Sequence, residues 1–231
     1  MRAASATYDA VGRFFAAAVG NGVRHVVVSP GSRSTALALC AEETAGLRTW
    51  IRIDERAAAF FALGLARAGG APAFLVCTSG TAAANYLPAV VEAHFAGVPL
   101  VVLTADRPPE LRDWGAGQTI DQSRLYGRHV RWFAEAPIAA ELSPEFAARW
   151  WPRFAARAVA HSVGADPGPV HIDWPLREPL EPPPDWPAAP SALAGAVPSP
   201  ADDGTPAPPS ALAGAATRLA ADDPSVALVA G

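Results

Sequence analysis

Side chains that could bind an anion follow the first predicted strand. The segment Ser29-Pro30-Gly31-Ser32-Arg33 comes directly after a β-branched run at 25–28. Ser32, Arg33 and the start of the following helix offer hydrogen-bond donors to a negatively charged group. The alternative is an ordinary connection with a solvated arginine, and composition alone slightly favours that alternative.

Two further turns carry an acid and a set of small hydroxyl side chains. Asp54 can cap a helix after the strand predicted at 49–53, and Glu55 would then interact favourably with the helix dipole. A sharper hypothesis makes Glu55 a buried acid at a cofactor, although the residues alone favour the capping role. The turn Thr78-Ser79-Gly80-Thr81 after 73–77 could approach a flat ligand or a phosphate. It lacks the spacing of a P-loop, so an ordinary helix start also explains it.

A long polar loop follows the strand predicted at 100–104. It runs from Asp106 through Gln122, and long loops in compact domains are often functional. Arg107 and Gln118 could bind a substrate carboxylate or carbonyl. Pairing of Asp106 with Arg107, together with general surface polarity, is the competing explanation.

These turns need a framework that brings them together, and the pattern of the chain predicts one. Short apolar runs alternate with helix-period stretches at the spacing of βαβ units, which predicts an α/β fold with a parallel sheet covered on both faces. Strands are expected at 25–28, 49–53, 73–77, 100–104, 130–134 and 170–173, and helices at 10–19, 34–43, 55–68, 81–95 and 144–162. Because ligands of such sheets bind beyond the carboxyl ends of the strands, all four turns should lie at one edge.

Composition narrows the classes of partner. The net charge is −4, and all 18 basic residues are arginine, so binding to nucleic acid or to an anionic membrane is not expected. Every cationic site must therefore be a guanidinium, which suits two-point binding of carboxylates. Cys40 and Cys77 lie in apolar runs and should be buried, reduced thiols. The histidines lack zinc-ligand spacing, no metal site is predicted, and the absence of an apolar span or leader suggests the cytoplasm.

The composition changes after residue 178. Prolines crowd the segment 179–209, which predicts a linker, and 210–231 alternates like the truncated start of a second, central α/β domain. The expected organisation is therefore one domain at 1–178, a proline-rich linker and an incomplete second domain.

Four segments together resemble one enzyme family: VVVSPGSRSTAL, RIDERAAAFFALGLAR, TSGTAAANYLPAVVEA and PLVVLTADRPPELRDWGAGQTIDQ. A glutamate after the second strand and a TSG-type turn are similar to the wider thiamine-diphosphate-dependent superfamily. The SPGSRS loop combined with DWGAGQTIDQ resembles, more narrowly, its synthase family in menaquinone biosynthesis. This resemblance covers about residues 8–177 and implies that 1–178 is a pyrimidine-binding domain, a three-layer sandwich with a six-stranded parallel sheet.

The resemblance also implies residue roles. Glu55 matches the catalytic glutamate that hydrogen-bonds the cofactor's aminopyrimidine ring and promotes removal of a proton from the thiazolium. Thr78, Gly80 and Thr81 match the lining of the cofactor site. The substrate-binding matches are Ser32, Arg33, Arg107 and Gln118. The implied activity is that of a transferase that decarboxylates 2-oxoglutarate on thiamine diphosphate and adds the succinyl unit to isochorismate. One departure is Gly117, where family members often carry asparagine.

The same resemblance implies a divided active site. The superfamily binds diphosphate and Mg²⁺ through a GDG motif that does not occur here, so that site is expected beyond residue 231. The implied partner is the diphosphate-binding domain of a neighbouring subunit in a homodimer or homotetramer, and the chain alone is expected to be inactive. Two alternatives stay open: a non-catalytic truncated module, and another thiamine-diphosphate enzyme, either acetolactate-synthase-like or a decarboxylase.

Overall fold

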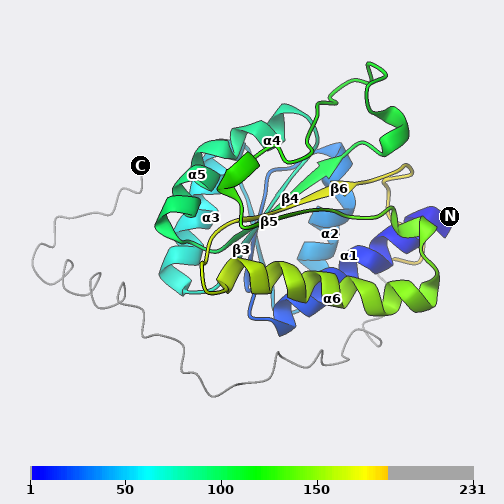
Figure 1. The fold of residues 1–231 in the computed structure, drawn as a ribbon. Helices are drawn as coiled ribbons and strands as arrows, with labels where there is room; N and C mark the ends of the chain where they lie inside the picture. The colour runs from blue at the N-terminus through cyan, green and yellow to red at the C-terminus, as the bar shows by residue number, and fades with distance from the viewer. Residues whose placement is uncertain (1, 187–231) are drawn as a thin grey trace, which may run out of the picture.

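The computed structural model describes residues 2–186, which form a six-stranded parallel sheet between two layers of helices (Figure 1). The strand order is β2-β1-β3-β4-β6-β5, and every neighbouring pair is parallel. The strands are β1 (His25–Val28), β2 (Arg48–Ile51), β3 (Ala73–Cys77), β4 (Leu100–Asp106), β5 (Trp132–Glu135) and β6 (Val170–Pro175). The predicted three-layer α/β sandwich and its six parallel strands are confirmed.

The helices divide between the two faces of the sheet. One layer contains α1 (Arg2–Gly20), α2 (Thr35–Glu43) and α6 (Pro144–Val163), and the other contains α3 (Glu55–Gly69), α4 (Thr81–Asn85) and α5 (Leu87–Ala96). Short 3₁₀ turns lie at Ser32–Ser34, Pro109–Leu111, Gly127–His129 and Ala139–Glu141.

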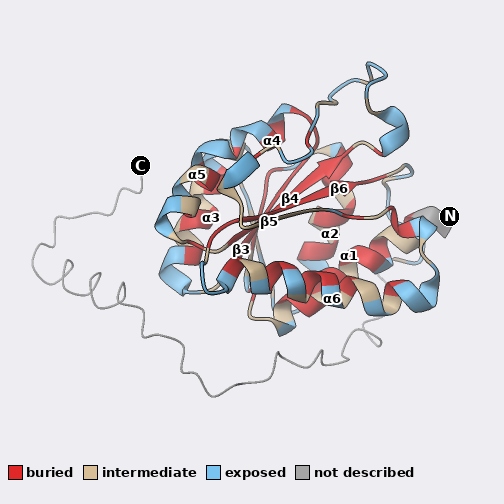
Figure 2. Ribbon diagram, in the orientation of Figure 1, coloured by how far each residue is buried: buried red, intermediate tan, exposed pale blue. Residues whose placement is uncertain are grey.

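The central strands are buried on both faces, as Figure 2 shows. Phe74 and Val76 of β3 pack into the core under α1, α2 and α6, whereas Ala73, Leu75 and Cys77 pack into the core under α3, α4 and α5. This alternation is the two-residue period of a pleated strand. It explains why these strands read as continuous apolar runs in the sequence.

Several element boundaries differ from the predictions. The helix predicted at 10–19 begins at residue 2, because buried Ala4 and Tyr8 continue its apolar face. The helix predicted at 81–95 is two helices, α4 and α5, separated at Tyr86. Pro88 stands in the first turn of α5, has no N–H to donate and cannot continue a helix from α4 without a clash. The left-handed glycines Gly70 and Gly97 end α3 and α5, and the strand predicted at 100–104 continues to Asp106.

Beyond β6 the described chain still contacts the domain. The hydroxyl of Tyr8 in α1 donates to the carbonyl of Leu180 at 2.9 Å, and the ring of Trp186 meets that of Tyr8 at 5.0 Å. The rest of the predicted linker and all of the predicted second-domain segment, 210–231, lie outside the described residues. No helix in the described part of the chain is long and apolar enough to cross a membrane. Cys40 and Cys77 are buried and free, as predicted.

An aromatic stack joins α6 to the sheet. The rings of Trp151 and Trp174 lie 5.2 Å apart and nearly parallel, and both side chains are fully buried. Trp151→Ala should therefore lower the free energy of unfolding by about 3–5 kcal/mol, through lost burial and the cavity left behind. Denaturant unfolding measures this. Trp114→Ala is the matched control, because that indole is 82% exposed, and its effect should stay within about 0.5 kcal/mol. Equal losses in the two variants would contradict the packing described.

Candidate functional site

The four predicted turns do lie at one edge of the sheet, because all six strands are parallel. They follow β1, β2, β3 and β4, and the chain leaving β6 joins them. A Cβ at Gly31 would collide with the side chain of Thr78, so the turns after β1 and β3 touch. Gly80, with φ +85°, packs against Gln118 in the loop after β4. Because neither glycine carries a side chain, the turns after β1, β3 and β4 can pack in direct contact.

Arg33 is buried beside the carboxyl end of β6. Its side chain is only 6% exposed, and it donates to the carbonyl of Leu176 at 2.8 Å and to the carboxylate of Glu178 at 3.1 Å. Its Nε is buried without a hydrogen-bond partner among the described residues. Burial lowers the pKa of Arg33, and the nearby charge of Arg107 lowers it further. Two guanidinium groups thus face one region, which favours an anion there.

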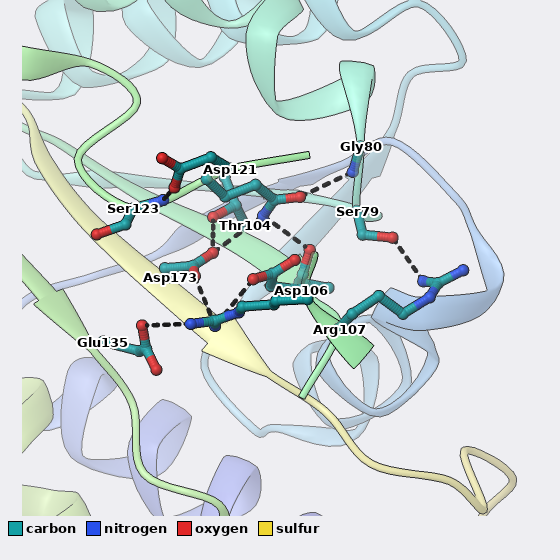
Figure 3. A network of polar contacts seen from close by, with 12 residues as sticks. Ser79, Gly80, Thr104, Asp106, Arg107, Asp121, Ser123, Glu135 and Asp173 are labelled. Atoms are coloured by element: carbon teal, nitrogen blue, oxygen red, sulfur yellow. Dashed lines mark hydrogen bonds and ion pairs between the residues drawn. The ribbon is translucent and has the colours of Figure 1, made fainter. Parts of the chain in front are cut away.

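Arg107 and Gln118 meet at the turn after β3. The Arg107 guanidinium donates to Ser79 Oγ at 2.6 Å and to the carbonyl of Gly117 at 3.1 Å, and Figure 3 shows the contact with Ser79. Gln118 Nε2 donates to the Ser79 carbonyl at 3.0 Å. The competing prediction, that Asp106 pairs with Arg107, is wrong, because Asp106 pairs with Arg112 at 2.9 Å.

Glu55 follows the turn after the edge strand β2. It is the first residue of α3, and Asp54 caps that helix by accepting from the Ala57 amide at 2.8 Å, as predicted. Glu55 is half-buried and makes no hydrogen bond or ion pair with the described residues. Its charge raises the pKa of Cys77 at the end of β3, although burial contributes more. The carboxylate therefore stands beside the strand ends without a protein partner.

The other predicted site residues make fewer contacts with one another. No described contact joins Glu55 to either arginine. Ser32 and Thr81 are exposed at the starts of their helical segments, and the carbonyl of Ser32 accepts from the hydroxyl of Thr35. Thr78 is buried, and its Oγ1 has no hydrogen-bond partner among residues 2–186. Thr78 thus has a buried polar atom that a ligand could bind, whereas Ser32 and Thr81 lie at the surface.

Sequence reasoning missed a buried polar network beneath the loop after β4. Side chains of β4, β6, β5 and the loop itself take part: the buried Thr104, Asp106, Gln122, His171 and Asp173, together with Arg112 and the exposed Glu135. Figure 3 shows Thr104, Asp106, Glu135 and Asp173 of this network. The sequence pattern that could have predicted this network lies in Thr104-Ala105-Asp106 and His171-Ile172-Asp173. In each, polar residues alternate with an apolar one at the end of a buried strand, which places the polar side chains on one face.

Within the described residues no group of three or more histidine, cysteine or acidic side chains could hold a metal ion. His171, one of the histidines predicted to be structural, is fully buried, and burial lowers its pKa to about 3. It is therefore a neutral member of the network.

The comparisons with known proteins agree with this geometry. The family model of the thiamine pyrophosphate enzymes, for their N-terminal TPP binding domain, matches residues 10–125, half of the chain. The chain belongs to this family. Its relatives include proteins named 2-succinyl-5-enolpyruvyl-6-hydroxy-3-cyclohexene-1-carboxylate synthase.

The similarity to these synthases is high but covers only part of them. One from Chloroflexus aurantiacus is 58% identical over 163 residues, which cover 70% of this chain and 27% of the relative. Another from Geobacillus thermodenitrificans is 57% identical over 161 residues, covering 70% and 27%. A third from Lysinibacillus sphaericus is 54% identical over 172 residues, covering 74% and 30%. The chain thus spans less than a third of the length of these relatives.

Proposed function

We propose that this chain is the pyrimidine-binding, N-terminal part of a transferase of menaquinone biosynthesis. The complete enzyme would decarboxylate 2-oxoglutarate with thiamine diphosphate and add the succinyl unit to isochorismate. The observation that carries the proposal is the placing of two guanidinium groups, Arg33 and Arg107, at the same strand ends as a partnerless glutamate. Both substrates are carboxylates, and fork-shaped guanidinium groups bind carboxylates at two points. The names of the relatives support the same activity.

The residues present fit the pyrimidine end of the cofactor. Glu55 has no hydrogen bond or ion pair of its own among the described residues, and Thr78 Oγ1 is buried without a partner. These groups, with Gly80 and Thr81, are the proposed contacts. When bound, thiamine diphosphate would supply an electron sink for the carbon–carbon chemistry. Glu55 would share a proton with the ring nitrogen of the aminopyrimidine and so hold the proton-transfer group in its reactive form.

Arg33 already binds a carboxylate, that of Glu178, and this contact suggests how a substrate would bind. The Glu178 side chain is 72% exposed, so its carboxylate is already largely hydrated and can move away from Arg33 at little cost. A substrate carboxylate would take its place on Arg33 and gain a second charge from Arg107. Gln118 and Ser32 would orient the remaining oxygen atoms of the substrate.

The diphosphate and Mg²⁺ would be held outside this chain. We propose as partner the diphosphate-binding domain of a neighbouring subunit, in a homodimer or homotetramer located in the cytoplasm. Residues 1–231 alone should turn over substrate negligibly, because they would supply only the pyrimidine half of the proposed site.

A substrate comparison on the full-length enzyme tests the proposal. Purified enzyme with thiamine diphosphate and Mg²⁺ is given 2-oxoglutarate plus isochorismate, or pyruvate alone, and product formation is followed by mass spectrometry. We expect the succinyl adduct of isochorismate from the first mixture and no acetolactate or acetaldehyde from the second. Turnover of pyruvate alone would instead support an acetolactate-synthase-like enzyme or a decarboxylase, and no turnover of either would support a non-catalytic module.

A further inference from the structure

The buried side-chain amide of Gln122 fixes the C-terminal end of the loop 107–122, which carries Arg107 and Gln118. Gln122 is 1% exposed, and its Oε1 accepts from the amide of Gly80 at 2.7 Å. Its Nε2 donates to the Ala105 carbonyl at 3.2 Å and to Asp173 Oδ1 at 2.9 Å. A single side chain thus joins the turn after β3, the strand β4 and the strand β6.

Arg112 connects the middle of the same loop to the strands β4, β5 and β6. Its Nη2 lies 2.9 Å from Asp106 and 3.4 Å from Asp173, and its Nη1 lies 3.0 Å from Glu135. Asp106 and Asp173 are both buried, 1% and 0% exposed, and they face the same guanidinium from neighbouring strands (Figure 3). Removing Arg112 would leave buried charges without compensation. Removing Gln122 would take hydrogen bonds from the Gly80 amide, the Ala105 carbonyl and Asp173.

The two aspartates carry more negative charge than their surroundings neutralise. The guanidinium of Arg112 contacts Asp106, Asp173 and Glu135. The charge of Arg33 also acts on Asp106, but Arg33 is already paired with Glu178, and His171 is neutral. Asp173 Oδ1 accepts from Thr104 Oγ1 and Gln122, whereas the carboxylate of Asp106 has its ion pair with Arg112 and no contact of hydrogen-bond geometry with a described group. The remaining neighbours, Tyr126 and Cys77, have pKa values raised far above neutrality by burial and are uncharged. A single proton held between the two carboxyl groups lowers this negative charge and gives Asp106 a hydrogen bond.

We propose that Gln122 and the Asp106–Asp173 pair, sharing one proton and clamped by Arg112, form a latch that positions Arg107 and Gln118. Gln122 and Asp173 are thus positioning residues for the loop. The functional importance of Arg107 and Gln118 rests on the proposed function, whereas the contacts of the latch do not depend on it.

The latch should weaken as pH rises. Burial raises the pKa of Asp106, and burial together with the charge of Asp106 raises the pKa of Asp173 to about 7. A carboxyl group exposed by opening of the loop titrates near 4, so between pH 4 and 7 the closed loop holds a proton that the open loop does not. Closure is therefore favoured most at the acidic end, loses strength as pH rises toward 7, and changes little above it.

Hydrogen–deuterium exchange of the whole 231-residue chain, without substrate or cofactor, tests the latch. Protection factors of backbone amides in 107–122, corrected for the intrinsic rate at each pH, are measured by mass spectrometry from pH 5 to pH 8. We expect the wild-type loop to lose at least about tenfold in protection between pH 5 and 7 while β3 stays protected. Gln122→Ala should lower loop protection about tenfold at pH 5, because its buried partners lose their hydrogen bonds.

Asp173→Asn separates positioning from mere structural support. An asparagine oxygen still accepts from Thr104 and Gln122, and its amide can donate to Asp106 without a titrating proton. This variant should keep the loop protected and remove the pH dependence. Asp121→Asn, at an exposed loop carboxylate that accepts from the Ser123 amide, is the control and should follow the wild-type profile. A wild-type profile that is flat with pH, or an Asp173→Asn loop that exchanges as fast as that of Gln122→Ala, would overturn the proposal. Since neither measurement involves substrate, a wrong substrate assignment would leave these results unchanged.

Discussion

Glu55→Gln should reduce kcat of the full-length enzyme by at least about 100-fold, the range that a positioned proton-transfer group contributes. Glutamine keeps the size of the side chain and its hydrogen-bonding capacity, but it cannot share a proton with the aminopyrimidine. Affinity for thiamine diphosphate should therefore change little. Steady-state rates, cofactor titration by fluorescence, and exchange of the cofactor's thiazolium C2 hydrogen into D₂O measure the three quantities.

Asp54→Asn is the matched control for this substitution. It also replaces a carboxylate by an amide at the start of α3, and asparagine can still cap the helix through Ala57. Near-normal turnover is expected in the control. Unchanged C2-hydrogen exchange in Glu55→Gln would remove Glu55 from the catalytic role.

Arg107→Ala should raise KM for the carboxylate substrates by about 10- to 100-fold, since hydrogen bonds to charged groups contribute about 1.5–3 kcal/mol. Arg107 also donates to Ser79 Oγ and to the Gly117 carbonyl, so the variant loses part of the loop's attachment. Cofactor affinity should be much less affected. Substrate dependence of the rate, together with equilibrium titration of thiamine diphosphate, separates the two effects.

Arg107→Lys sharpens the test of this assignment. Lysine keeps the charge but cannot reproduce the two-point geometry of guanidinium, so only partial recovery of KM is expected. Arg128→Ala, at an exposed arginine in the 3₁₀ turn after the loop, should leave KM unchanged. A larger loss of cofactor affinity than of substrate affinity in Arg107→Ala would assign this arginine to the cofactor instead.

Local patterns of the sequence were enough to predict the architecture. The apolar runs at 25–28 and 73–77 are β1 and β3 as predicted, and Asp54 and Gly70 bound α3 as their chemistry requires. Two helices were predicted wrongly: the first begins at residue 2 and not at 10, and the helix predicted as continuous at 81–95 is broken. At the break Pro88 acts locally, and the Tyr86 hydroxyl donates to the Val76 carbonyl.

The candidate residues were also identified from the sequence, because each follows a predicted strand and parallel strands end at one edge. Their roles could not be derived in the same way and came from family resemblance. What each side chain contacts was not predictable: Arg107 pairs with Ser79, from a turn 28 residues earlier, and not with its neighbour Asp106.

By itself, the sequence determined the parallel sheet, the order of its strands along the chain and the strand-end turns, since these depend on hydrophobic period and on capping residues near in sequence. Only the tertiary structure decided that β6 lies beside β4, bringing Asp173 against Asp106, Gln122 and Arg112. That contact is between residues 51 to 67 positions apart. The charges of this network depend on burial by four segments of the chain: β4, the loop after it, β5 and β6. No local pattern of residues encodes that burial.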